Sequence, residues 1–128
     1  MTVTIEDILS KFPETVSTLA LRLRQFLLNQ LKGIIEQPDN SANIIGYGFG
    51  PGYKDMICTI ILSKKGVKLG LYKGTDLPDP GKLLTGSGKV HKYVEIKSTQ
   101  DLNNEVRNLL DEALKMYKKR TASNPKAN

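Results

Sequence analysis

Residues Met56–Leu71 read MICTIILSKKGVKLGL, and this stretch decides the fold class. Its first half is a continuous run rich in β-branched residues, which is typical of a central β-strand. Residues 63–66, SKKG, then indicate a tight hairpin turn. After the turn, Val67, Leu69 and Leu71 alternate with residues that are polar or small, as in a half-buried strand. Two strands joined this closely leave no room for a crossover helix, so the sequence predicts an antiparallel sheet.

Two further strands flank this hairpin in the sequence. Asn43–Phe49 precedes it and gives way to a loop rich in glycine and proline, and Lys89–Lys97 follows it. In the last strand, the two-residue period places Val94 and Ile96 on the apolar face. Lys92 shares that face, so its ammonium must either reach the edge of the sheet or line a cavity.

Helices are predicted before and after the strands. Residues Thr4–Lys11 carry acidic side chains where a first helical turn favours them, which predicts a short helix. Residues Pro13–Gln37 open with a proline suited to a helix start and repeat apolar side chains at helical spacing. Ser98 is the candidate N-cap of a C-terminal helix whose apolar stripe reaches Tyr117.

This order of elements predicts an α+β fold with N-terminal helices, an antiparallel sheet of about four to five strands, and a C-terminal helix packed on the sheet. We expect one domain over residues 1–119 and a disordered basic tail over residues 120–128. The predicted core contains apolar residues from the long helices and from the strands: Leu23, Leu27, Ile60, Leu69, Val94, Leu109 and Leu110.

Composition excludes several kinds of site. The single cysteine, Cys58, permits no internal disulfide, and the single histidine, His91, excludes a two-histidine metal site. Cys58 lies in an apolar run, so we interpret it as a small buried hydrophobe. No Ser-His-Asp or Cys-His spacing favours an enzyme, and we expect no cofactor. No apolar run approaches the ~18 residues of a membrane span, and the first residues do not read as a signal peptide, so a cytoplasmic protein with no membrane partner is expected.

The net charge of +6 is concentrated in two parts of the chain. Residues 54–97 hold nine lysines against four acidic residues, and residues 115–128 hold five basic residues and no acidic one. A basic sheet favours anionic ligands. A lysine-rich solvated surface is the alternative explanation of the same pattern.

The stretch Leu77–Ser98, LPDPGKLLTGSGKVHKYVEIKS, contains most of the candidate site. Its residues 86–89, GSGK, lead into a strand and are not followed by Ser or Thr, unlike a true phosphate loop. A looser anion site of glycine amides and lysine is one interpretation, and a turn selected for its backbone conformation is the other. The candidate ligand-binding residues are Lys68, Tyr72, Gly86, Gly88, Lys89, Lys92 and Tyr93. Asp76 and Asp79 are weak candidates for a hard-cation site, although Asp before Pro more often caps a turn.

Several short motifs follow one another in a recognisable order: Gly46-Tyr47-Gly48, Leu69-Gly70-Leu71, LPDP at 77–80, GSGK at 86–89 and KYV at 92–94. They resemble the YdhG-like family of unknown function, domain of unknown function family 1801, over about residues 42–114. The resemblance implies a compact α+β domain whose curved antiparallel sheet is backed by helices. It also implies, through one bacterial branch, an iron-handling role like that of frataxin. Acidic residues of the C-terminal helix, Glu105, Asp111 and Glu112, are candidates for a weak acidic ridge of that type, and a solvated helix face is the alternative interpretation.

Three hypotheses of function follow. The first is a small cytoplasmic binding domain that holds an anionic small molecule or partner through its basic sheet surface and glycine loops. The second is the iron-chaperone-like protein that the resemblance implies. The third is a nucleic-acid binder, expected to be weak and non-specific because aromatic residues are few and no reading helix is recognised. We expect a monomer or a homodimer.

Overall fold

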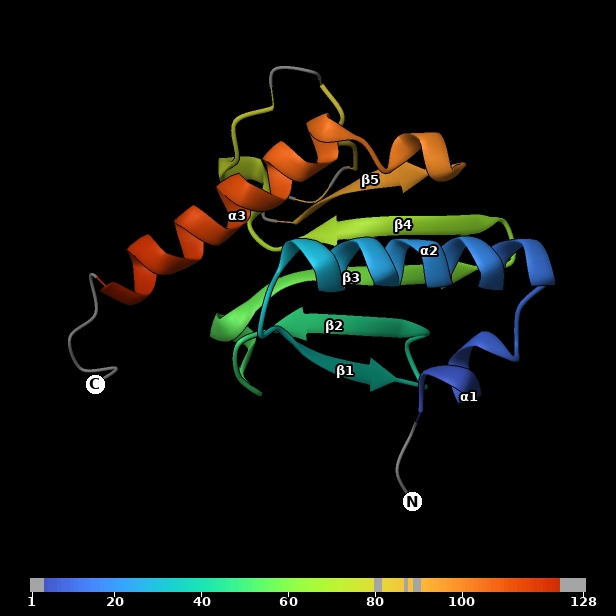
Figure 1. Ribbon diagram of the computed structural model, residues 1–128. Coiled ribbons are helices and arrows are strands. Elements are labelled where there is room, and N and C mark those ends of the chain that lie inside the picture. The colour runs from blue at the N-terminus through green and yellow to red at the C-terminus, as the bar shows by residue number, and fades with distance from the viewer. Residues whose placement is uncertain (1–3, 80–81, 87, 89–90, 123–128) are drawn as a thin grey trace.

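The computed structural model describes residues 4–79, 82–86, 88 and 91–122 (Figure 1). Its main elements are α1 (Ile5–Leu9), α2 (Glu14–Gln30), β1 (Ile35–Asp39), β2 (Ile44–Gly48), β3 (Met56–Ser63), β4 (Gly66–Leu71), β5 (Lys92–Ile96) and α3 (Asn104–Ala122). The strands form one antiparallel sheet in the order β1-β2-β3-β4-β5. The α+β fold predicted from the sequence is therefore confirmed.

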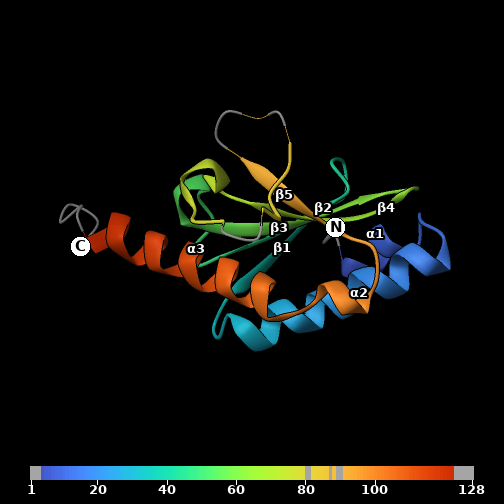
Figure 2. The same cartoon turned by 90° about the horizontal axis from the view of Figure 1, so that it is seen from above.

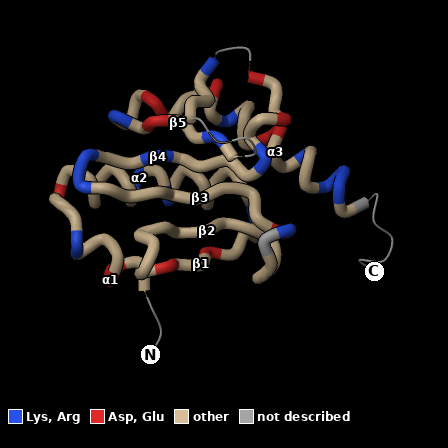
Figure 3. Tube along the Cα trace, turned by 180° about the vertical axis from the view of Figure 1, so that it is seen from behind, with Lys and Arg blue, Asp and Glu red and all other residues tan. Residues whose placement is uncertain are grey.

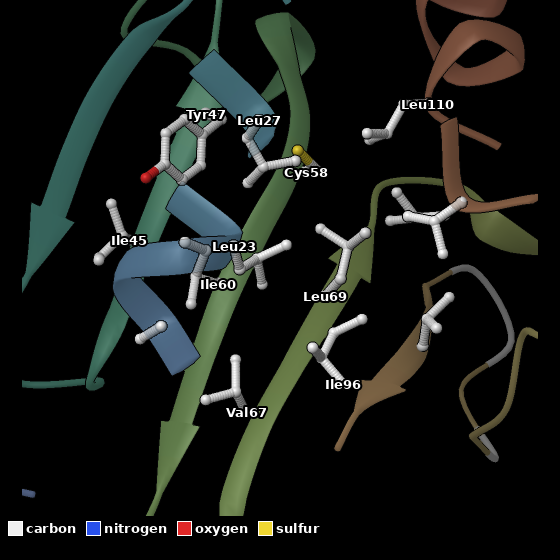
Figure 4. Packing of buried hydrophobic residues seen from close by; sticks show 14 of the residues in the cluster. Leu23, Leu27, Ile45, Tyr47, Cys58, Ile60, Val67, Leu69, Ile96 and Leu110 are labelled. Carbon is white, nitrogen blue, oxygen red and sulfur yellow. The ribbon is translucent and has the colours of Figure 1, made fainter. Parts of the chain in front are cut away.

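Helices α2 and α3 lie on the same side of the sheet, as Figure 2 shows. We call the face toward them the inner face and the opposite one the outer face. Cross-strand register places Ile45, Ile60, Leu69 and Val94 side by side on the inner face, where each is at most 5% exposed. Helix residues close this layer from the other side, including Leu23, Leu27 and Leu110 (Figure 4). All seven predicted core residues are buried.

The predicted second helix ends earlier than expected. Helix α2 stops at Gln30, and Gly33 then adopts a φ of +80°, a conformation that glycine adopts without the steric cost other residues meet. The chain reverses there, and Ile35–Asp39 pairs with β2 as an edge strand. Extending the helix to Gln37 was wrong because apolar residues 34 and 35 continue the helical spacing, although they belong to a turn and a strand.

Two boundaries near the C-terminus also differ from the prediction. Ser98 accepts a hydrogen bond in a capping box with Asp101, but the structure it caps is a 3-10 turn, Thr99–Asp101. Helix α3 begins only at Asn104 and continues to Ala122. Arg120 is therefore helical, so starting a disordered tail at residue 120 was wrong. Residues 123–128 of that tail lie outside the described residues.

A half-buried ion pair joins the edge strand to the helix layer. Arg24 of α2 donates two hydrogen bonds to the carboxylate of Glu36, at 2.7 and 3.0 Å, and the phenol of buried Tyr47 donates a third at 2.7 Å. Partial burial raises the pKa of Glu36, but the hydrogen bonds from Arg24 and Tyr47 lower it by more than burial raises it. The pKa of Glu36 therefore lies below the ordinary value. The carboxylate thus holds β1, β2 and α2 together.

Truncation of Leu110 tests the assignment of the inner face. Leu110→Ala should lower the free energy of unfolding by roughly 2–5 kcal/mol, because it leaves a cavity in the core. Leu21→Ala on α2 is the matched control, since Leu21 is 44% exposed and should change stability by about 0.5 kcal/mol or less. Urea denaturation measures both; equal effects would contradict the assigned faces.

The hydrogen-bonded group of Arg24, Glu36 and Tyr47, which we call the Glu36 cluster, predicts that the stability of the fold depends on pH. Glu36→Gln should lower the free energy of unfolding by roughly 1–2 kcal/mol at neutral pH, less than a fully buried charged hydrogen bond because solvent reaches the pair. The folded pKa of Glu36 is below its unfolded value, so this stabilisation is present above the unfolded pKa and is lost as pH falls through the folded pKa.

The difference between wild type and Glu36→Gln should therefore shrink as urea titrations move to pH values below the ordinary pKa of glutamate. Glu112→Gln is the control, because its ion pair with Lys115 is longer, at 3.4 Å, and the lysine side chain is 72% exposed. A loss in Glu112→Gln as large as that in Glu36→Gln would refute a special role for the Glu36 cluster.

Candidate functional site

The outer face of the sheet carries the candidate site. Neighbouring residues alternate between the faces, so buried Ile45 and Ile60 point inward while half-buried Ile44 and Ile61 lie on the outer face. Figure 3 shows the sheet from this side, with strands β2 and β3 free of charged residues. A groove of about 390 Å³ runs over this face. We call it the outer groove; residues that line it include Ile44, Met56, Thr59, Ile61, Gly70, Tyr72, His91, Lys92 and Tyr93.

Glycine at position 70 determines the floor of the outer groove. A Cβ atom on Gly70 would stand 2.4 Å from Thr59 Oγ1 and 3.1 Å from Ile61 Cδ1, so these side chains occupy the space that its absence leaves. Gly70 pairs with Thr59 on one side and with Tyr93 on the other. The side chains of β3 can therefore spread across β4, which gives the groove a shallow, largely apolar floor.

Aromatic rings and a lysine form the β5 side of the groove. The Nζ atom of Lys68 lies 4.3 Å from the ring centroid of Tyr93, a cation–π contact. The rings of Tyr72 and His91 are 5.1 Å apart, and His91 Nδ1 accepts a hydrogen bond from the backbone N–H of Lys73. A flat ligand on this floor would meet ring surfaces at one side and a cation beside them.

Thr85 and Gly86, at the start of the glycine loop, are fixed to the β5 side of the outer groove. Thr85 and Tyr93 exchange backbone hydrogen bonds of 2.8 and 3.0 Å, which attaches the loop to β5. Gly86 has a φ of +113°, and a Cβ there would lie 2.8 Å from the ring of Tyr93. Lys92 Nζ donates a hydrogen bond to the carbonyl oxygen of Gly86. The ammonium of Lys92 is thus satisfied by the loop and holds it against the strand.

The structure brings together five of the seven predicted ligand-binding residues. Tyr72, Tyr93 and Lys92 line the outer groove, Lys68 stacks on Tyr93, and Gly86 contacts both Tyr93 and Lys92. Gly88 is exposed and close to the backbone of His91 rather than to the rings. Lys89 lies outside the described residues.

The two aspartates proposed for a cation behave differently from each other. Both carboxylate oxygens of Asp79 accept backbone hydrogen bonds, from Leu83 at 2.9 Å and from Leu84 at 2.8 Å. This is the turn-capping role that the sequence offered as the alternative. Asp76 is exposed in a 3-10 turn. In the described part of the chain, no three histidine, cysteine or acidic side chains gather in a way that could hold a metal ion.

The single cysteine has no role at the surface. Cys58 is fully buried on the inner face, and this burial raises the pKa of its thiol. A protonated, inaccessible thiol is a poor nucleophile. The interpretation of Cys58 as a small buried hydrophobe is confirmed.

Arg120 also contributes to the site, although the sequence pattern does not predict it. Its guanidinium lies 4.9 Å from the ring of Tyr72 and 5.1 Å from that of Tyr117, and it donates to the carbonyl oxygens of Lys54 and Met56 at 3.0 and 3.1 Å. A planar guanidinium suits such stacking. Arg120 thereby fixes the end of α3 beside the outer groove. The sequence pattern does not predict this role, because Arg120 follows the last apolar residues of the helical stripe.

No family model, curated protein or solved structure matches this chain. The likeness to the YdhG-like family therefore stays a prediction. No helix in the described part of the structure is long and apolar enough to cross a membrane.

Proposed function

We propose that this chain is a binding domain whose outer groove takes a small anionic molecule with a flat apolar body. The observation that carries this proposal is the contact of Lys68 with Tyr93 beside a floor of uncharged side chains. The floor would bury the apolar body, Tyr93 would stack on it, and Lys68 would meet its negative charge. A volume of about 390 Å³ suits such a molecule.

The surroundings of the groove favour an anion over a cation. Lys73 lies 5.8 Å from the ring of Tyr72, and Arg120 and Lys68 also contact rings there. Asp39 lines the far side, but its carboxylate accepts hydrogen bonds from Ser41 and Ala42. The cations thus face the ring side of the groove, whereas the nearby acid is engaged in its own turn.

The alternatives differ in the support they have. Tyrosines and lysines on a sheet face also occur where single-stranded nucleic acid stacks, so weak nucleic-acid binding is the second candidate. The iron-handling alternative would need oxygen or nitrogen ligands, and the described residues contain no cluster of three. The geometry therefore supports the small-molecule hypothesis best.

The probe for the experiment is anilinonaphthalene sulfonate, an anion with a flat naphthalene ring, with neutral N-phenylnaphthylamine as the uncharged analogue. Lys68→Gln should weaken binding of the sulfonate about fivefold and leave the neutral analogue nearly unchanged, as expected for one solvent-exposed charge contact. Tyr93→Leu should weaken binding of both probes, because each loses its stacking surface. Fluorescence titration gives the affinities.

Lys64→Gln is the matched control, because it removes the same charge from the exposed hairpin turn. Equal weakening in Lys64→Gln and Lys68→Gln would assign the effect to net charge and contradict the proposal. Tighter binding of an oligothymidylate than of either probe, persisting at about physiological salt, would favour the nucleic-acid candidate instead. If sedimentation shows a stable dimer and neither probe binds, the outer groove would instead be a surface for self-association.

A further inference from the structure

A second hollow lies at the other end of β4, away from the Tyr72 end of the outer groove. It has a volume of about 460 Å³ and is bounded by the first half of α2, the turn between β3 and β4, and the end of β5. We call it the hairpin groove. A shallower hollow shares Thr15, Leu19 and Lys97 with it and extends it along α2 to Arg22.

Strand register brings two lysines together in the hairpin groove. Val67 pairs with Ile96, so the next positions, Gly66 and Lys97, face one another where the two strands end. Lys65 directly precedes Gly66 in the turn, which Figure 3 shows in blue. Both lysines are exposed and line the groove. The sequence predicts a basic sheet but not this juxtaposition of Lys65 and Lys97.

These lysines have no acidic partner among the described residues, whose ion pairs are Arg24–Glu36 and Lys115–Glu112. Glu95 lies opposite Lys68 on the neighbouring strand and lines the same hollow, yet it forms no ion pair within that described set. Lys65, Lys97 and Arg22 therefore outnumber the two acidic residues that line the joined hollows, Glu14 and Glu95.

The groove also offers room and a neutral donor. Nothing lies within 4 Å of the point where a Cβ atom on Gly66 would stand, so the glycine leaves the floor open. Thr15 lies on the α2 wall and carries a hydroxyl group. Ser63 lines the turn side, but its hydroxyl donates to the carbonyl oxygen of Gly66 and accepts from the backbone N–H of Lys65. Ammonium groups with the Thr15 hydroxyl beside them match the oxygens of a phosphate group, which carries more than one negative charge and accepts several hydrogen bonds.

We propose that the hairpin groove binds the phosphate group of a small phosphorylated molecule. The half-buried side chain of Leu19 on the α2 wall would contact the rest of that molecule. This site is separate from the outer groove and does not depend on the function proposed for it. Lys68 lines the hairpin groove but stacks on Tyr93 at the outer groove, so the variants below leave it unchanged.

The test is a calorimetric titration of the full chain with inorganic pyrophosphate at low ionic strength. Lys97→Gln should weaken binding about fivefold, and Lys65→Gln by a similar factor, since each removes one charge from the groove. Lys119→Gln on exposed α3 is the control with the same change of charge and should bind as the wild type does. Binding of anilinonaphthalene sulfonate should be the same in all these proteins.

Each other result overturns the proposal. Absence of pyrophosphate binding by the wild type would show that the hollow is a solvated basic surface. Equal weakening in Lys97→Gln and Lys119→Gln would show that pyrophosphate responds to overall charge. Loss of sulfonate binding in Lys97→Gln would show that the two grooves are not independent. Circular dichroism of each variant confirms that a lost signal does not come from unfolding.

Discussion

The fold depends on burying one face of a five-stranded sheet under two helices. Along β3, Cys58 and Ile60 point to the helices, and Thr59 and Ile61 point away. Because side chains alternate strictly, the demand for an apolar inner face fixes which residues remain on the outer face. The composition of the outer groove is therefore a consequence of register, and a slip of one residue would exchange its lining with that of the core.

The outer face differs from an ordinary solvated face in the middle of the sheet. A sheet with one side in water usually alternates apolar and charged residues, yet β2 and β3 contain no charged residue at all. On the β5 side, charges begin at β4, where Lys68 contacts the ring of Tyr93, and on the other side Asp39 of β1 lines the groove. An apolar area bordered by cations on one side is what an amphipathic anion would recognise. The glycine loop, the Lys92 hydrogen bond and Arg120 hold this border in position.

Local patterns in the sequence were sufficient for much of this architecture. The β3–β4 hairpin follows from period-two alternation around a short turn, and the core residues follow from the helical stripes. The edge strand β1 did not follow, because Ile34 and Ile35 fit the helical period and only the positive φ of Gly33 reveals the reversal. Pro38 within β1 also argues against a strand unless it lies at an edge, which the order of strands alone reveals.

The candidate site, like the fold, could be predicted from the sequence only in part. Strand parity and the loop motif identified Lys92, Tyr93 and Gly86, which do lie together. The partner of Lys92 is a backbone carbonyl oxygen, and no sequence pattern encodes which carbonyl a loop presents. The Thr59 side chain packs over Gly70, and Arg120 stacks between two tyrosines. Both arrangements depend on contacts between residues that are not adjacent in the sequence. Such contacts require the assembled fold.

Isoleucine methyl NMR tests the central claim most directly, because Ile44 and Ile45, like Ile60 and Ile61, are adjacent in the sequence but lie on opposite faces. On titration with anilinonaphthalene sulfonate, the methyl signals of Ile44 and Ile61 should shift and show intermolecular contacts with the probe. Those of Ile45 and Ile60 should stay in place, since they are at most 1% exposed. Contacts from the probe to Ile45 or Ile60, or an absence of any at Ile44 and Ile61, would contradict the account.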